Sequence, residues 1–134
     1  MTTIPESHID LLSTDVAMLA TIGPDGSPQV TALWFLLDDD GVVKMSLNTA
    51  RQKTKNLAEH PECSFFVLDR ANPYRTLEIR ARATITPDDN YAFADKITRK
   101  YGMDLRAMDG PGQSRVVVAL EPVKVNVYGP PAQQ

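Results

Sequence analysis

The segment Asn48–Leu57 holds the residues of this chain that are best suited to bind a ligand. Three cations, Arg51, Lys53 and Lys55, fall in the first turns of a predicted helix, and no acidic residue of the segment precedes Glu59. The helix dipole disfavours an exposed cation at this end by about 0.3 to 1 kcal/mol. An anion would relieve the repulsion, because free backbone N–H groups and cations at a helix start together favour phosphate. The sequence therefore predicts a phosphate site or, as the alternative, an ordinary solvated basic helix.

Two hydroxyl side chains strengthen the phosphate interpretation. Thr49 and Thr54 lie in the same segment and can each donate to a phosphate oxygen. Helical spacing predicts that Arg51 and Lys55 share a face, whereas Lys53 points elsewhere. The site would draw on these side chains together with the helix N-terminus.

Other kinds of site have little support. His8 and His60 are the only histidines, and we expect both to be exposed, which argues against nucleophilic catalysis. No nucleophile elbow, phosphate-binding P-loop, dinucleotide fingerprint or zinc-protease motif occurs in the sequence. The acidic runs 38–40 and 88–89 are explained by a turn and a helix start, so we expect no metal. Cys63 lies in an apolar run typical of an inert core thiol. The residues alone identify no catalytic side chain.

Length and composition indicate one domain, residues 1–134. Of the 134 residues 43% are hydrophobic, which is enough to build a core without disulfides. Fourteen Lys and Arg against 17 Asp and Glu give a net charge of −3, so we expect no nucleic-acid partner. The single cysteine and the lack of a membrane-spanning apolar run favour a cytoplasmic location and no membrane partner.

Turn residues and alternating apolar positions predict a mainly β domain of the α+β class. Strands are expected at 16–22, 28–37, 42–47, 63–68, 74–85, 115–120 and 124–128. Helices are expected at 7–12, at 50–60 with a start near Asn48 or Thr49, and from Thr86 onward; residues 102–113 and the tail from Gly129 should be irregular. Short strands joined by tight turns favour an antiparallel barrel over a parallel sheet. Trp34 and Phe35 would then lie in the core unless their strand lines a cofactor.

Several motifs in this order resemble one known protein family. They are the strand and turn 19–30 (LATIGPDGSPQV), the helical segment 51–57 (RQKTKNL) with Pro61 shortly after it, and the strand segment 78–83 (EIRARA). With 125–129 (VNVYG) closing the last strand, the chain resembles the flavin- and deazaflavin-binding split β-barrel proteins related to pyridoxamine 5'-phosphate oxidase. The resemblance covers nearly the whole chain. It implies an FMN-binding-like antiparallel split β-barrel with inserted helices, and a homodimer with two cofactor sites at the subunit interface.

The same resemblance implies which residues bind the cofactor. The phosphate cluster would be Arg51, Lys53, Thr54 and Lys55, which agrees with the unneutralised cations. The ring system would lie along the strand residues Gln29, Thr31, Ala32, Leu33 and Trp34, with Ser46, Leu47, Asn48 and Thr49 near the ring or its ribityl chain. Asn72, Pro73 and Tyr74 would reach across from the partner subunit.

Within this family the chain is most similar to the branch that uses the deazaflavin coenzyme F-420, because of the arginine-x-lysine-threonine pattern at 51–54. The implied activity is an oxidoreductase that passes a hydride from the reduced cofactor to a conjugated, electron-poor small molecule. FMN is the alternative cofactor, and a non-catalytic cofactor carrier is the alternative function. The sequence lacks the C-terminal Arg-x-His segment of true pyridoxamine 5'-phosphate oxidases, which argues against vitamin interconversion.

Overall fold

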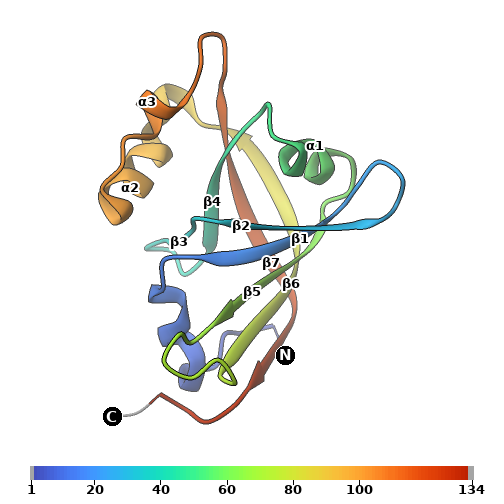
Figure 1. Cartoon of the computed structure of the whole chain (residues 1–134), viewed down its shortest axis with the longest axis vertical. Coiled ribbons are helices and arrows are strands. Elements are labelled where there is room, and N and C mark those ends of the chain that lie inside the picture. The colour runs from blue at the N-terminus through green and yellow to red at the C-terminus, as the bar shows by residue number, and fades with distance from the viewer. Residues whose placement is uncertain (1, 133–134) are drawn as a thin grey trace.

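The computed structural model describes residues 2–132, whose strands form one antiparallel sheet. In chain order the elements are η1 (a 3-10 helix, Glu6–Ser13), β1 (Ala17–Ile22), β2 (Pro28–Leu33), β3 (Leu36–Leu37), β4 (Val43–Asn48), α1 (Gln52–Glu59), β5 (Glu62–Leu68), β6 (Thr76–Pro87), η2 (Asp89–Tyr91), α2 (Ala92–Tyr101), α3 (Leu105–Met108) and β7 (Arg115–Tyr128). Within the described residues seven strands lie in the order β2-β1-β5-β6-β7-β4-β3, and the sheet curls into a half-barrel (Figure 1). The predicted mainly β, antiparallel split-barrel fold is confirmed.

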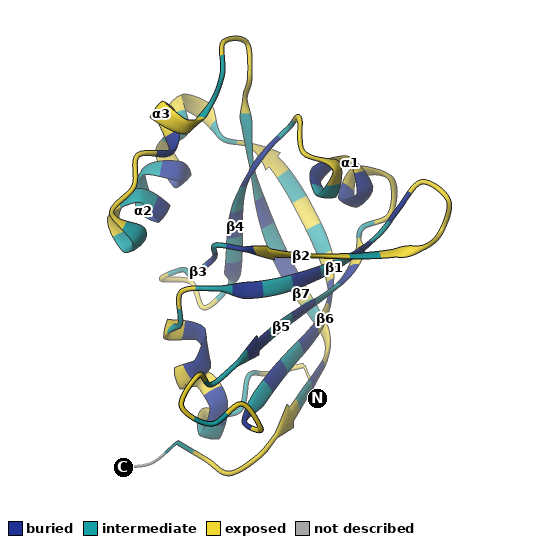
Figure 2. Ribbon diagram, viewed as in Figure 1, coloured by how far each residue is buried: buried dark blue, intermediate teal, exposed yellow. Residues whose placement is uncertain are grey.

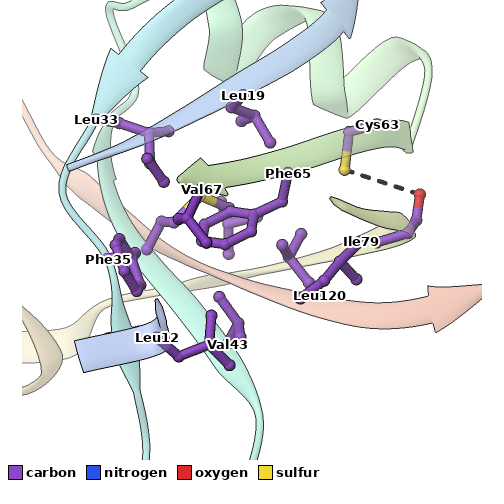
Figure 3. Close-up of a cluster of buried hydrophobic side chains, with 14 of the residues drawn as sticks. Leu12, Leu19, Leu33, Phe35, Val43, Cys63, Phe65, Val67, Ile79 and Leu120 are labelled. Carbon is purple, nitrogen blue, oxygen red and sulfur yellow. Dashed lines mark hydrogen bonds between the residues drawn. The ribbon is translucent and has the colours of Figure 1, made fainter. Parts of the chain in front are cut away.

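Alternating side chains of the strands fill the interior of the curled sheet. Buried and less buried residues alternate along β1, β5 and the first half of β6 (Figure 2), as expected where one face of a sheet is covered. Phe35 and Phe65 meet edge to face at the centre, with ring centroids 5.0 Å apart (Figure 3). Cys63 is buried as predicted, 3.8 Å from the carbonyl oxygen of Ala81, and burial raises the pKa of its thiol to about 11.

The longest pair of strands, β6 and β7, runs through the middle of the sheet. The sequence predicts two strands where β7 is one continuous strand of 14 residues. The register shifts at this place, since Arg80 pairs with Lys124 but Ala81 pairs with Pro122, which leaves one extra residue in β7. A β-bulge of this kind tolerates a proline, because the proline has no N–H to give to the ladder. Pro122, which in the sequence suggests a gap between two strands, therefore marks only a local bend within the continuous strand β7.

Helix α1 begins at Gln52, later than the predicted start near Asn48 or Thr49. The Asn48 side chain accepts the N–H of Ala50 at 2.8 Å, and the N–H of Thr49 bonds to the carbonyl of Ser114 at 2.9 Å. These bonds hold residues 48–50 in a turn, so that Arg51 becomes the cap residue of the helix.

Helix α2 begins at Ala92, whereas the sequence predicts a helix from Thr86. Strand β6 continues to Pro87, and the carboxylate of Asp88 then accepts the N–H groups of Phe93 and Ala94, both at 2.9 Å. An acidic side chain at this position satisfies donors that the helix leaves free. None of the helices formed by residues 2–132 has the length and apolar composition that a bilayer crossing requires.

Buried polar side chains tie the first described residues of the chain to the segment that follows β7. His8, expected to be exposed, is only 2% exposed, and its Nε2 lies 2.9 Å from the carbonyl oxygen of Tyr128. The buried Arg75 bonds to both carboxylate oxygens of Asp10 and, at 2.7 Å, to the carbonyl of Pro130. The tail from Gly129 has no regular secondary structure, as predicted, but it is not free, because Arg75 holds the carbonyl of Pro130.

The side chain of Asp38 links the β3–β4 turn to α2. Its carboxylate accepts hydrogen bonds from Lys44 at 2.9 Å and Lys96 at 3.1 Å. The Lys44 ammonium, opposed by burial, lowers the pKa of Asp38 from 3.8 to about 2. A lowered pKa stabilises the fold above the unfolded value, so Asp38→Asn should reduce the free energy of unfolding at pH 7 by about 1 to 2 kcal/mol.

This difference should shrink as the pH falls from 3.8 and disappear below about 2, where the wild-type carboxyl is protonated in both the folded and the unfolded state. Chemical denaturation of wild type and variant across this range measures it. The control is Asp39→Asn at the exposed neighbouring position, which should change the free energy of unfolding by less than about 0.5 kcal/mol. A difference that persists at the lowest pH, or an equal loss in the control, contradicts the prediction.

Candidate functional site

A cavity of about 170 Å³ lies between the ends of β2 and β4, the start of α1 and the α2–α3 segment. It is lined by Leu33, Trp34, Ser46, Leu47, Asn48, Arg51, Lys53, Ile97, Leu105, Met108 and Arg115, and we call it the Trp34–Arg51 cavity. Figure 1 shows that α1 and the α2–α3 segment stand on either side of the ends of β4 and β7. The α1 side of the cavity is cationic, and the α2–α3 side is apolar.

Arg51 and Lys53 form the cationic side. Arg51 caps α1, Lys53 lies in the first turn, and that turn contains no acidic residue. The Lys53 ammonium lies 3.3 Å from the hydroxyl of Thr31 on β2, and its burial, with Arg51 beside it, lowers the pKa of Lys53. Within residues 2–132 no carboxylate side chain lines the cavity. The two cations and the free N–H groups of α1 therefore favour an anionic ligand.

Hydrogen bonds around Asn48 fix the position of this cationic side. The hydroxyl of Thr54 donates to the Asn48 carbonyl at 2.8 Å, so this predicted phosphate ligand is buried and ties α1 to β4. The side chain of Asn48 donates to Asp109 at 3.0 Å and to Gln113 at 2.9 Å. The end of β4 is thus held from α1 on one side and from the α3–β7 loop on the other, which sets the place of Arg51.

Arg115 is a cavity residue that the sequence does not single out. Its Nε and Nη2 each lie 2.8 Å from an oxygen of Asp109, and the two side chains are 9% and 5% exposed. The hydroxyl of Tyr91 also donates to Asp109, at 2.6 Å. Burial raises the pKa of Asp109, but the hydrogen bonds from Arg115, Tyr91 and Asn48 outweigh it and lower the pKa overall. This bidentate pair locks the end of α3 to the start of β7.

A trough continues from the cavity along the same pair. It has a volume of about 410 Å³ and is lined by Asn48, Ala50, Arg51, Met108, Asp109, Gly110, Gln113 and Arg115. Because Asn48, Arg51 and Arg115 line both spaces, the cavity and the trough adjoin one another.

The α2–α3 segment supplies the apolar wall. Leu105 and Met108 belong to α3, which lies within the region 102–113 that the sequence predicts to be irregular. Asp104 starts this short helix by accepting a backbone N–H at 3.0 Å. Ile97 and Leu105 belong to a small hydrophobic cluster that is separate from the main core. The wall therefore rests on this small cluster, against which Leu36 of β3 and Val117 of β7 also pack.

Trp34 stands at a break in the sheet. The sequence predicts one strand over 28–37, but β2 ends at Leu33 and β3 begins at Leu36. The Trp34 ring stacks on Tyr101 of α2, with centroids 4.5 Å apart and planes 10° from parallel. The break turns Trp34 out of the sheet and into the cavity wall.

The structure brings together about half of the predicted cofactor residues. Those that line the cavity are Leu33, Trp34, Ser46, Leu47, Asn48, Arg51 and Lys53. Thr31 and Ala32 are exposed on β2. The Thr49 hydroxyl bonds instead to the backbone carbonyl and the hydroxyl of Ser114, and the Gln29 side chain accepts from the Asn56 side chain at 2.9 Å.

The remaining predicted residues lie elsewhere in the chain. Lys55 lines a different groove, beside Glu59 and His60. The expectation that Arg51 and Lys55 share a face is wrong, because Lys53 is the residue that lines the cavity with Arg51. Asn72, Pro73 and Tyr74 lie in the β5–β6 loop, far from α1 at the other end of the fold (Figure 1).

Comparison with known proteins agrees with this fold. The family model for pyridoxamine 5'-phosphate oxidase matches residues 5–129. The chain belongs to this family. Membership in the pyridoxamine 5'-phosphate oxidase family supports a flavin-type oxidoreductase. A search of curated proteins gave no match.

Solved structures similar to this member of the pyridoxamine 5'-phosphate oxidase family include an F420 reductase. It is 35% identical, with a TM-score of 0.79, and the match covers 92% of this chain and 98% of that one. The conserved hypothetical protein Rv2991 from Mycobacterium tuberculosis is 24% identical, with a TM-score of 0.75 and coverage of 95% and 86%. HupZ from Group A Streptococcus is 19% identical, with a TM-score of 0.72 and coverage of 98% and 100%. The last two show the shared fold.

The buried Asp109–Arg115 ion pair should contribute to the stability of the fold. Asp109→Asn should lower the free energy of unfolding by about 3 kcal/mol, because Arg115 then stays buried without its countercharge. Asp95→Asn is the matched control, since the Asp95–Arg106 pair of the same segment is 43% and 50% exposed. The control should lose less than about 1 kcal/mol. Urea denaturation compares them, and equal losses would show that the buried pair has no special role.

Proposed function

We propose that this protein is an oxidoreductase that binds coenzyme F-420 in the Trp34–Arg51 cavity and passes a hydride to a conjugated, electron-poor small molecule. The observation that carries the proposal is one cavity with two cations and no carboxylate on one side and an aromatic, apolar wall on the other. A ligand that satisfies both sides has an anionic group and a flat ring, as phosphorylated flavins and deazaflavins do. The 35% identical F420 reductase supports the deazaflavin.

The volumes fit such a cofactor if the cavity and the trough are used together. Clefts that enclose a ligand of this class measure about 300 to 1,000 Å³. The cavity alone has about 170 Å³, and the adjoining trough has about 410 Å³. The two adjoining spaces of one chain together therefore reach the size that such a cofactor needs. We also propose a homodimer with the cofactor sites at its interface, a common arrangement in this family, in which the second copy would cover the exposed side of the cofactor.

In that dimer we place the β5–β6 loop of the second copy beside the cavity. Tyr74 in this loop is 75% exposed, next to Asn72 and Pro73. The buried Arg75 fixes the loop from behind through a bond to Asp69 at 3.1 Å. An exposed aromatic side chain on a fixed loop is well suited to contact a ring across an interface.

Each side of the cavity would have its own task. When bound, the reduced cofactor would supply the hydride. Arg51 and Lys53 would hold its phosphate through charge-assisted hydrogen bonds, and Ser46 and Asn48 would lie along its chain. Trp34 and the apolar α2–α3 wall would orient the ring and exclude water. The lone buried cysteine takes no part, and its presence suits a reducing, cytoplasmic compartment.

FMN is the second candidate cofactor, supported by the family itself, and a carrier without turnover is the alternative function. Titration of the purified protein with coenzyme F-420 and, separately, with FMN distinguishes them through the fluorescence of Trp34 and of the cofactor. Tighter binding of F-420, with oxidation of reduced F-420 by a panel of conjugated ketones and quinones, supports the proposal. Tighter binding of FMN would identify FMN as the cofactor, and binding of F-420 without turnover would identify the protein as a cofactor carrier. If neither cofactor binds, the F-420 oxidoreductase, the FMN alternative and the carrier alternative are all contradicted.

The cationic side gives a direct mutational prediction. Replacing Arg51 and Lys53 together by alanine should weaken F-420 binding at least tenfold, or about 1.4 kcal/mol. The fold should remain, since Arg51 is exposed and Lys53 only half-buried. Lys55→Ala on the other side of α1 is the matched control and should change the affinity less than twofold. Unchanged affinity in the double variant with a native circular dichroism spectrum contradicts the site.

A further inference from the structure

Two side chains of α2 replace the ladder hydrogen bonds that the sheet loses between β2 and β3. The hydroxyl of Tyr101 accepts the N–H of Phe35 at 3.0 Å and donates to the carbonyl of Phe35 at 3.0 Å. The ammonium of Lys100 donates to the same carbonyl at 2.8 Å and lies 3.9 Å from the Phe35 ring centroid. A buried backbone amide needs such partners, because leaving it unpaired is unfavourable. The break between β2 and β3 is therefore stabilised by hydrogen bonds from α2, in contrast to a frayed strand end.

This break sends two neighbouring aromatic rings in opposite directions. Phe35 is fully buried in the main core against Phe65. Trp34 lines the cavity, and Tyr101, which does not line it, stacks behind at 4.5 Å. Tyr101 thus contacts this segment in two ways: its hydroxyl hydrogen-bonds to the Phe35 backbone, and its ring stacks on the Trp34 indole. Stacking of this geometry is worth about 0.5 to 1.5 kcal/mol beyond the area buried.

We propose that Tyr101 is a positioning residue that holds the Trp34 indole at a fixed angle, so that the cavity selects ligands with a flat ring. The inference rests on the proposed function, because the ring it concerns is that of the bound cofactor. Tyr101 acts only through Trp34 and Phe35, and not by touching the ligand. It adds ring selectivity to a site whose anion affinity comes from Arg51 and Lys53.

The test is Tyr101→Phe, which keeps the ring but removes the hydroxyl that hydrogen-bonds to the Phe35 backbone. Trp34 is the only tryptophan, so its emission reports this site alone. In the unliganded variant we expect emission at longer wavelength and lower anisotropy than in wild type. Binding of F-420 or FMN, whichever wild type prefers, should weaken at least fivefold. Binding of ribose 5-phosphate, a phosphate without the ring, should change less than twofold.

Two further variants separate positioning from a general loss of structure. Tyr128→Phe, at a residue that is 68% exposed and outside the cavity, should leave emission and both affinities as in wild type. Lys100→Met removes the other bond to the Phe35 carbonyl and should shift emission and ring affinity in the same direction as Tyr101→Phe, by a smaller amount. It keeps the proposal testable if Tyr101→Phe unfolds, as judged by circular dichroism.

The inference is overturned if Trp34 emission and anisotropy stay at their wild-type values in both variants, or if ring and ribose 5-phosphate affinities fall equally. Failure of the proposed function gives a different result, namely that wild type binds neither F-420 nor FMN. In that case the emission and anisotropy of the unliganded proteins alone decide whether Tyr101 positions Trp34.

Discussion

Two cations at the start of α1, with no carboxylate to neutralise them among the described residues that line the cavity, are the constraint around which the site is organised. Their repulsion by the helix dipole is about 0.3 to 1 kcal/mol each when exposed, and burial adds to it at Lys53. The fold keeps them there because Thr54 and Asn48 fix α1 on the end of β4. An anion that binds only the folded state would relieve this repulsion, and the same free energy would stabilise the fold.

The half-barrel gives this charged site a rigid support and a second, apolar side. The long β6–β7 pair carries the sheet, and β4 pairs with β7 so that Arg115 lies opposite Asn48. The Asp109–Arg115 pair then closes the α2–α3 segment onto this corner of the sheet. That segment packs on a second, smaller hydrophobic cluster to which residues of the sheet also contribute, so the apolar wall and the cationic side are parts of the site held by different contacts. The cavity lies where these two parts meet.

Local patterns in the sequence place most of the strands, the turns and the basic helix, although not all of their ends and breaks, because period-two alternation and turn residues act over a few positions. The features that shape the site depend on distant partners. The strand break at Phe35 depends on Tyr101, 66 residues further on, and the burial of His8 depends on the carbonyl of Tyr128, 120 residues away. Arg115 was missed for the same reason, since nothing near it in the sequence shows that it faces Asn48 and Arg51. The charge pattern at the helix start pointed to Arg51 and Lys53, and the family resemblance added Leu33, Trp34, Ser46, Leu47 and Asn48, but neither supplied the wall from α2 and α3.

The most direct measurement for the central claim is a map of backbone amide and Trp34 indole chemical shifts in the isotope-labelled protein as coenzyme F-420 is added. We expect two groups of shifted signals, one at the start of α1 around Arg51 and Lys53 and one at Trp34 and the α2–α3 wall. Shifts of this pattern would show that a single ligand bridges the cationic and aromatic sides. Signals that move only in the groove around Lys55, or at no defined place, would contradict it.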